Sequence, residues 1–485
     1  MIASNEDLKR GVKPSGPIPN PCLSYWQRTT RAFPHLNANR NEDIPNECPY
    51  VIIGSGISGA LTAFELTESG VNGKDVIILE AREAASGASS RNAGHVRPGM
   101  IESPNVNVGS TREPLLIILS DAFRGFKHYS AFHGPEQALK IIANERLVLE
   151  KVDEFVRKHD IQCDFNLTTT FDVCMTPEFA AYEAENFEAF KKAGGDVSHV
   201  KYYDTEEAQN RTGVNNAVAA YEWPAGSSHP AKLAQWLLNA AIERGVTLFT
   251  HCSVSKVTKH DNGESWDVHT PRGNVTTRNV IHCTNAYAAL LLPQLEPHLT
   301  PNRAQAHSLI APPAFSGSNT LGSTFSLRYG LHHFYSLIQC MNDGTMIFGV
   351  SRGNPNLSPE TLRGYVTFED RDYNEEILNE ALRQWQVLFP GKDQDIAGRD
   401  VHGEGLDHAW TGIIGVTADS VPFVGPVEGM NGQWVCAGFG GHGMARIFTC
   451  APGIVKLMLG KEWSETGLPE CFNMNKERAL KLGSK

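Results

Sequence analysis

An apolar strand that runs directly into a glycine-rich turn places the strongest constraint on how this chain folds. Residues 50–53 are Tyr-Val-Ile-Ile, and glycines follow at positions 54, 56 and 59. A helix-like segment over 60–69 comes next, then a second apolar strand over 75–79 that ends at Glu80. This order, with an acid about 20 residues after the last glycine, is the fingerprint of a dinucleotide-binding βαβ unit.

Each part of this unit has a physical role. Gly54 permits the tight turn, Gly56 lets the backbone approach a pyrophosphate, and Gly59 allows close packing of helix on strand. The helix N-terminus presents unpaired N–H groups and the positive end of its dipole to the phosphates. Glu80 is placed to accept hydrogen bonds from ribose hydroxyls. The predicted dinucleotide contacts in this unit are Gly54, Gly56, Ile57, Ser58, Gly59, Glu80, Ala81 and Arg82.

Composition and charge argue against several classes of protein. The 485 residues carry a formal net charge of −11, which disfavours non-specific binding to nucleic acid or to an anionic membrane. The longest apolar runs fall far short of the about 20 residues that a spanning helix needs. The N-terminus lacks the apolar core of a secretory signal, so the cytosol is the expected location. Ten cysteines are scattered without C-x-x-C spacing, which predicts reduced thiols and no metal site.

Nucleotide-binding character returns twice further along the chain, near 230–283 and 409–459, after intervening blocks such as the helix expected over 132–161. We therefore predict an α/β fold. In this fold, the segments of a discontinuous Rossmann-like domain alternate along the chain with those of an α+β substrate domain built on a mixed sheet. The predicted parts are an N-terminal arm (1–47), the dinucleotide-binding segments (48–100, 220–299 and 405–460), the substrate-domain segments (101–219 and 300–404) and a C-terminal tail (461–485).

Two further segments favour FAD over NAD. Residues 84–99 are small, polar and rich in glycine, whereas an NAD-binding unit usually continues into another amphipathic helix. Such a loop is suited to wrap a pyrophosphate and to reach along a flavin; the alternative is a surface loop with no special role. Residues 434–446 run from a strand through a glycine-rich turn into a helix, whose amides can stabilise negative charge on reduced flavin. The predicted FAD contacts therefore extend to Ser90, Arg91, Asn92, Gly94, His95, Val254, Gly441, His442, Gly443 and Met444.

Taken together, these motifs resemble the FAD-dependent oxidoreductases of the D-amino-acid oxidase and glycine/sarcosine oxidase superfamily. The likeness spans roughly 48–460 and is strongest to the gamma-glutamylputrescine oxidoreductase-like branch common in fungi. It rests on the Gly54–Gly59 turn with Glu80, the Gly87–Pro98 loop, the Trp410–Gly425 segment and the Gly438–Gly443 turn. The resemblance implies a substrate sheet that roofs the flavin, and oxidation of a C–N bond to an imine that hydrolyses. Reduced flavin then passes its electrons to O2, which yields hydrogen peroxide.

The resemblance also suggests candidate catalytic residues. Arg97 aligns with an arginine that grips the substrate carboxylate in sarcosine-oxidase-like relatives; the alternative is a structural ion pair. A lysine that follows the glycine turn in those relatives is replaced here by Ala445, which weakens the case for a sarcosine-like substrate. Tyr335 is expected either to line the substrate pocket or to pack in the core. His442 is expected to contact the flavin edge through its backbone, with catalysis by its imidazole as a weaker alternative.

The family's covalent flavin links have no counterpart in this chain. The position of a linking histidine is Arg91, and the linking cysteine of sarcosine oxidases falls near Gly412. We therefore predict non-covalent FAD, a small-molecule amine or amino acid as substrate, and O2 as acceptor. Two alternatives remain open at this point: an FAD dehydrogenase that uses a quinone or protein acceptor, and a flavin-binding protein without turnover.

Overall fold

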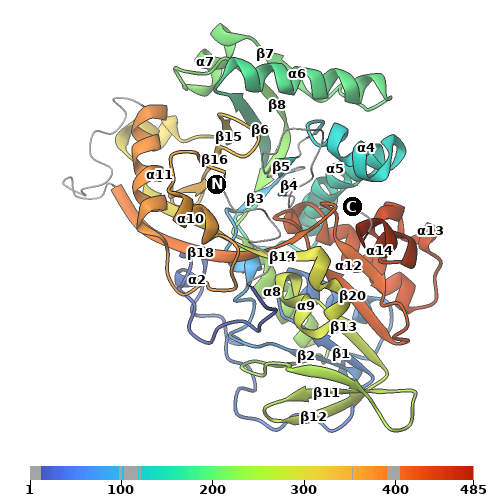
Figure 1. Cartoon of the computed structure of the whole chain (residues 1–485). Helices are drawn as coiled ribbons and strands as arrows, with labels where there is room; N and C mark the ends of the chain where they lie inside the picture. Colours follow the sequence, from blue (N-terminus) through green and yellow to red (C-terminus); the bar gives the residue numbers. More distant parts are fainter. Residues whose placement is uncertain are drawn as a thin grey trace.

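Two separate sheets organise the part of the chain that the computed structural model describes (Figure 1). That part comprises residues 12–97, 122–351, 353–389 and 405–483, together with the backbone of two short strands at 101–102 and 118–119. One sheet has six strands and is mostly parallel, and the other has nine strands and is mostly antiparallel. The α/β fold class predicted from the sequence is confirmed.

The six-stranded sheet is built around the strand that precedes the glycine-rich turn. Its order is β19-β20-β13-β1-β2-β9, and every pair is parallel except β19 with β20. Val51, Ile52 and Ile53 are all buried, as expected for a parallel strand that is covered on both faces. The strands are β1 (Tyr50–Ile53), β2 (Val76–Leu79), β9 (Thr247–Phe249), β13 (Asn279–His282), β19 (Phe423–Pro426) and β20 (Gln433–Ala437).

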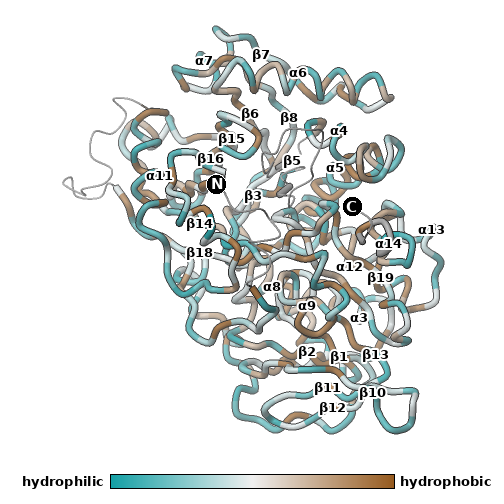
Figure 2. Tube along the Cα trace, in the orientation of Figure 1, coloured by the Kyte–Doolittle hydropathy of each residue, from teal (hydrophilic) through white to brown (hydrophobic). Residues whose placement is uncertain are grey.

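Different layers cover the two faces of this sheet. Ile52, on one face, joins the apolar core under the helices α3 (Ile57–Glu68), α8 (Pro230–Glu243) and α12 (Ile447–Met458). Val51, on the other face, packs with a three-stranded antiparallel sheet. In Figure 2 the central strands β1, β2 and β13 are accordingly among the brown, hydrophobic segments. The small sheet consists of β10 (Lys256–Lys259), β11 (Trp266–Thr270) and β12 (Gly273–Thr277).

The nine-stranded sheet is mixed, as predicted. Its order is β18-β14-β17-β16-β15-β6-β8-β3, with β7 also paired to β8, and only the β6–β15 pair is parallel. Two further strands, β4 (Ile101–Glu102) and β5 (Ile118–Leu119), pair separately. The strands of the large sheet are β3 (His95–Val96), β6 (Asn166–Cys174), β7 (Lys201–Tyr203), β8 (Ala219–Ser227), β14 (Leu299–Ile310), β15 (Thr324–Arg328), β16 (Phe334–Gln339), β17 (Met346–Val350) and β18 (Gly405–Thr417).

Helices cover this sheet on its outer side (Figure 1). Trp385 of α11 packs with Leu337 and Phe348 on one face of the sheet. Among the described helices, none has an apolar stretch long enough to cross a bilayer. The remaining helices are α2 (Tyr25–Arg28), α4 (Phe126–His133), α5 (Pro135–Lys158), α6 (Pro177–Lys192), α7 (Thr205–Thr212), α9 (Ala288–Leu291), α10 (Pro359–Arg363), α11 (Glu375–Leu388), α13 (Trp463–Thr466) and α14 (Lys476–Gly483).

Several predicted boundaries differ from the structure. The helix expected over 132–161 is two helices, because Gly134 has a φ of +84° and Pro135 starts a new helix. β8 and β18 belong to the nine-stranded sheet, although the predicted boundaries place most of β8 and all of β18 in dinucleotide-binding segments. Conversely, Phe155 of α5 packs on Phe448 of α12 with ring centroids 5.4 Å apart. The proposed division into domains therefore stays a prediction.

Candidate functional site

A cavity lies between the carboxyl ends of the parallel strands and one face of the nine-stranded sheet. Its volume is about 270 Å³, close to the lower end of the roughly 300–1,000 Å³ usual for small-ligand pockets. Ends of parallel strands in open α/β sheets are the usual place for nucleotide ligands. The cavity wall combines Gly54 and Leu79 from the first unit, Thr284 after β13, and Phe334 and Ser336 from β16.

The glycine-rich turn requires glycine for steric reasons. Gly54 has a φ of +103°, and a Cβ there would lie 2.6 Å from the carbonyl oxygen of Cys283. A Cβ on Gly59 would lie 2.0 Å from the carbonyl oxygen of Gly54. Gly56, Ile57 and Ser58 begin α3 and line the cavity, so the N–H groups and positive dipole end of this helix face it.

Glu80 follows β2 and lies in the cavity wall. Its Oε2 accepts hydrogen bonds from the Ser55 amide at 2.9 Å and the Ser55 hydroxyl at 2.7 Å. Its Oε1 accepts one from the Arg82 amide at 2.9 Å. These bonds fix the carboxylate at the cavity and leave lone pairs for a hydroxyl ligand, which is the geometry expected of a ribose contact.

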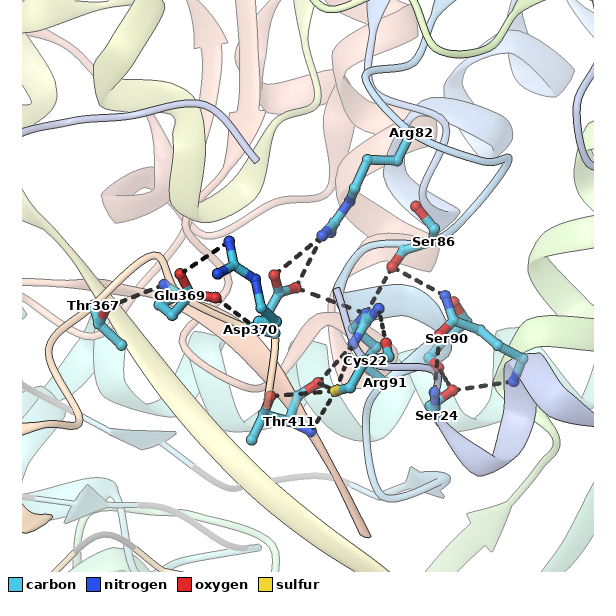
Figure 3. Close-up of polar contacts among 12 residues, drawn as sticks. Cys22, Ser24, Arg82, Ser86, Ser90, Arg91, Thr367, Glu369, Asp370 and Thr411 are labelled. Carbon is cyan, nitrogen blue, oxygen red and sulfur yellow. Dashed lines mark hydrogen bonds and ion pairs between the residues drawn. The ribbon is translucent and has the colours of Figure 1, made fainter. Parts of the chain in front are cut away.

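The N-terminal arm holds the predicted FAD loop in place (Figure 3). The Arg91 guanidinium donates to the carbonyl oxygens of Cys22 at 2.6 Å, Thr411 at 2.9 Å and Ser86 at 2.8 Å. The Trp26 indole donates to the Asn92 carbonyl at 2.7 Å. The arm also supplies Pro17 to the cavity wall. Arg91 therefore connects the arm, the loop and β18. It also lines the cavity.

A second arginine of this region forms a buried ion pair. Arg82 Nη1 lies 3.0 Å from Asp370 Oδ2, and both side chains are almost fully buried. The same Asp370 carboxylate lies 3.9 Å from Arg91 Nε, as Figure 3 shows. Because Asp370 faces both guanidinium groups, these arginines stabilise the protein framework. The phosphates of a dinucleotide would thus rely mainly on backbone amides at the start of α3.

Most of the predicted FAD contacts lie in one cavity wall. Those that line it are Gly54, Gly56, Ile57, Ser58, Glu80, Ala81, Arg82, Arg91, Asn92, Val254, Gly441, Gly443 and Met444. The other predicted contacts, which lie behind the wall among the described residues, are Gly59, Ser90, Gly94, His95 and His442. Gly94 shows why: a Cβ there would meet Ile338 at 2.8 Å and Trp26 at 2.9 Å, so this glycine serves packing.

The three predicted catalytic residues also lie outside the described wall, and Tyr335 points away from it. Phe334 and Ser336 face the cavity, so the alternation of β16 turns Tyr335 to the opposite face. There its ring stacks on Phe348 with centroids 5.4 Å apart, and Asn354 Nδ2 donates to its hydroxyl at 2.8 Å. The core-packing alternative for Tyr335 is therefore the one that the structure favours.

His442 is not part of the described cavity wall. Its neighbours Gly441 and Gly443 line the wall, whereas its Nδ1 lies 3.6 Å from Glu145 Oε1 behind it. Burial, reinforced by Arg446, lowers the pKa of His442 well below its usual range, so the ring is neutral. Arg97 is buried at the end of β3, where its Nη1 donates to Thr170 Oγ1 at 3.0 Å.

Sequence reasoning missed several residues of the wall. Thr284 and Asn285 follow β13, whose carboxyl end lies beside that of β1. If β13 had been recognised as a parallel neighbour of β1, the residues after it would have been predicted to line the site. Phe334, Ser336 and Gly349 carry no comparable signal, because their place depends on the pairing of β16 with β17.

The residues present fit FAD. The glycine turn and the N-terminus of α3 could hold phosphates, and Glu80 could accept a ribose hydroxyl. The cavity extends from there to β16 and leaves space for an extended ligand. A Cβ at Gly412 would lie 2.8 Å from the Arg91 Cβ. The two positions that the resemblance aligns with flavin-linking residues therefore lie close together.

Comparison with known proteins agrees with this site. The family model described as FAD dependent oxidoreductase matches residues 49–457. The chain is 25% identical over 454 residues to a probable oxidoreductase OrdL of Rhizobium meliloti, covering 91% of this chain and 89% of that protein. It is 22% identical over 443 residues to the gamma-glutamylputrescine oxidoreductase of Escherichia coli, covering 90% and 89%.

Solved structures show the same fold. Glycine oxidase from Geobacillus kaustophilus superposes with a TM-score of 0.66 at 19% identity, covering 89% of this chain and 99% of that chain. L-proline dehydrogenase from P. horikoshii superposes with a TM-score of 0.64 at 20% identity, covering 91% and 99%. At these identities the likeness concerns the fold alone.

Proposed function

Because the chain belongs to the family of FAD dependent oxidoreductases, we propose that it oxidises a C–N bond of an amine or amino acid to an imine and passes the electrons to O2. The observation that carries this proposal is the single cavity that unites the α3 turn and Glu80 with the face of the nine-stranded sheet. One ligand in that cavity would have its phosphates at the helix and its reactive end under β16 and β17.

FAD, when bound, supplies the acceptor for a hydride from the carbon next to nitrogen. The protein has three tasks beside it. The α3 turn and Glu80 hold the cofactor. Phe334, together with the sheet around it, positions the substrate carbon and excludes water. A desolvated pocket also lowers the pKa of an ammonium group, so that the amine reacts in its neutral form.

We further propose that FAD is bound without a covalent link, since Arg91 and Gly412 occupy the positions that carry such links in relatives. Acid precipitation should release all flavin, at about one FAD per chain. Flavin retained on the denatured pellet would contradict this part of the proposal.

The proposal also includes a branch and a location. The similarity to gamma-glutamylputrescine oxidoreductase supports a place in the branch of that name that is common in fungi. All ten cysteines are free thiols, seven of them buried, which supports a reducing compartment such as the cytosol.

The test is anaerobic mixing of the purified yellow protein with a panel of amines and N-methyl amino acids. Bleaching of the flavin by at least one class of amine is expected, followed by peroxide release when O2 is admitted. Bleaching without peroxide would favour a dehydrogenase with another acceptor. A flavin that no amine reduces would favour a binding protein without turnover.

A further inference from the structure

A buried ion pair lies behind the glycine-rich turn that precedes α12. The Arg446 guanidinium donates to Glu145 Oε1 from Nε at 2.9 Å and from Nη2 at 2.6 Å. Arg446 is 0% exposed and Glu145 is 1% exposed. Glu145 belongs to α5, whereas Arg446 is the N-cap residue of α12. The pair therefore connects a helix of the predicted substrate segment to the predicted flavin-edge turn.

This pair lies next to residues that line the cavity. Met444 and Ile447, two positions before Arg446 and one position after it, are both part of the wall. His442 Nδ1, in the same turn, lies 3.6 Å from Glu145 Oε1. Burial and then the nearby Arg446 lower the pKa of His442, so this imidazole adds no charge of its own. The two charges of the pair thus act on this end of the cavity from close by.

Further contacts hold the Arg446 guanidinium in one place. Its Nη1 donates to the Ser420 carbonyl at 3.0 Å, and its Nη2 also donates to the Tyr129 hydroxyl at 2.8 Å. One turn into α12, Thr449 Oγ1 donates to Asn144 Oδ1 of α5 at 3.1 Å. All three nitrogens of Arg446 have acceptors on the protein, so its effect on a ligand in the cavity is exerted through its charge.

The position of Arg446 is unfavourable for the helix that it begins. A helix N-terminus carries the positive end of the dipole, where acids are stabilising and cations are not. A buried cation also requires a counter-ion, and Glu145 supplies it. Residues that break a local preference in this way are expected mainly at functional sites.

Reduction of a flavin changes the charge that this pair faces. A hydride from the amine carbon brings two electrons and one proton to the flavin, so the ring gains one negative charge. A nearby positive charge stabilises that form and a nearby negative charge destabilises it, and both effects are strong where little water intervenes. Arg446 and Glu145 therefore have opposite effects on how readily the flavin is reduced.

We propose that the Arg446–Glu145 pair sets the reduction potential of the flavin. Arg446 stabilises the reduced form, and Glu145 is a positioning residue that fixes the guanidinium and limits its effect. The inference rests on the proposed function, since it requires FAD with its ring near the 440–447 end of the cavity. It goes beyond that function by assigning to α5 control of the driving force for amine oxidation.

The direct test measures the midpoint potential of the flavin in the FAD-loaded protein, without O2, against reference dyes. Glu145→Gln removes the negative charge and keeps an oxygen that accepts from Arg446, so the potential should rise. Glu145→Gln/Arg446→Gln removes both charges, and its potential should return towards that of the unchanged protein. Glu145→Gln/Arg446→Lys keeps the positive charge and should keep the raised potential.

A second readout is the ionisation of the flavin N3–H group, followed by the absorbance of the oxidised flavin. Loss of this proton also places a negative charge on the ring, so Glu145→Gln should raise the ionisation constant by roughly threefold or more. The variant without both charges should reverse this change. Glu150→Gln is the matched control, because Glu150 lies on the same helix with its side chain 66% exposed. It should change neither readout.

A merely structural role predicts a different pattern. Loosening of the turn would weaken FAD binding most in the double variants, and the second substitution would not reverse the effect of the first. An unchanged potential in a folded, FAD-loaded Glu145→Gln protein would overturn the inference. If that single variant does not fold, the two double variants decide, because they differ by one charge at residue 446. The lysine form must then have the higher potential, and equal potentials would contradict the proposal.

The two proposals fail in distinguishable ways. The midpoint potential and the N3–H ionisation require bound flavin and no substrate, whereas bleaching by the amine panel reports the proposed function. If amines bleach the flavin and the variants leave its potential unchanged, the role of the pair is wrong and the oxidase remains. If the potentials shift as expected and no amine bleaches the flavin, the role of the pair stands while the oxidase proposal fails.

Discussion

The two sheets that meet at the cavity are built on opposite principles. On the side of the six-stranded sheet the wall includes a glycine-rich turn, the first amides of α3 and one fixed carboxylate, Glu80. On the side of the nine-stranded sheet the wall is made by side chains, with Phe334 and Ser336 in it and Arg328 next to it. Backbone amides are suited to bind the cofactor, which is the same throughout a family. Side chains are suited to bind the substrate, because they can differ between relatives that share a fold.

The largest effect is expected at the backbone side. In Gly59→Ala the new Cβ would lie 2.0 Å from the Gly54 carbonyl oxygen, so α3 must move away from the turn. We expect the free energy of unfolding to fall by about 3 kcal/mol, the upper end for overpacking, and most of the protein to purify without FAD. The control is Gly322→Ala, since Gly322 has ordinary φ and no atom within 4 Å of its Cβ position. A yellow, fully loaded Gly59→Ala protein would refute the steric argument.

Acid sensitivity compares the two sheets directly, because each holds a fully buried histidine. Burial lowers the pKa of His282 on β13 and of His307 on β14 to about 4, while an unfolded histidine titrates near pH 6.5. Between these values the unfolded chain binds more protons than the folded one. The free energy of unfolding therefore falls as the pH drops from 6.5 towards 4, by up to about 3 kcal/mol for each histidine.

Denaturant unfolding at pH 7 and pH 4.5 measures this difference. His282→Asn and His307→Asn should each reduce the loss of stability between the two pH values, even if both variants start less stable. A variant whose loss equals that of the unchanged protein would show that its histidine is not held neutral. If the two variants change different unfolding transitions of the protein, the two sheets unfold independently.

Glu80→Ala tests the single side chain on which the backbone side depends. A charge-assisted hydrogen bond of this kind contributes roughly 1.5–3 kcal/mol, so FAD affinity should fall about ten- to a hundredfold. Fluorescence quenching of added FAD measures it. Glu83→Ala is the matched control, because Glu83 pairs with Arg31 at 2.6 Å and is absent from the described cavity wall. Equal FAD affinity in the two variants would show that Glu80 does not contact FAD. Neither variant should bind NAD.

The smallest effect is expected at Tyr335, on the outer face of the other sheet. Tyr335→Phe removes a hydroxyl that bonds Asn354 at 2.8 Å and Glu380 at 3.3 Å. Stability should fall by about 1 kcal/mol, with the rate of flavin reduction unchanged. Slower reduction of the flavin at unchanged stability would indicate that Tyr335 acts in the substrate pocket.

The contrast between the sheets also explains what the sequence predicts. Gly54, Gly59 and Glu80 act within one local unit, so their spacing alone indicates both the fold and the cofactor. The wall residues after β13 follow from the same rule once the parallel neighbour is known. The discontinuous plan is also visible, since strands of the six-stranded sheet come from three distant stretches of sequence.

The substrate side depends on pairings that a local pattern does not contain. Arg328 meets Asp172 because β15 lies parallel to β6, about 150 residues earlier in the chain. Phe334 and Tyr335 are adjacent and equally apolar, and a shift of one residue in register would exchange their faces. The sequence alone leaves Tyr335 either in the pocket or in the core, and the pairing of β16 with β15 and β17 places Phe334 at the cavity.

The arm that joins Cys22 to β18 has a consequence for how this protein is made. Cys22 and Thr411 are 389 positions apart, yet their side chains lie 3.5 Å from each other beside Arg91. A ribosome that has released the first hundred residues has already produced the whole glycine-rich unit. The nascent chain still lacks β13, β20 and β18, and contacts of such separation form late and slowly. The cavity wall includes Thr284 and residues 412–414, so it is complete only when nearly the whole polypeptide has been made.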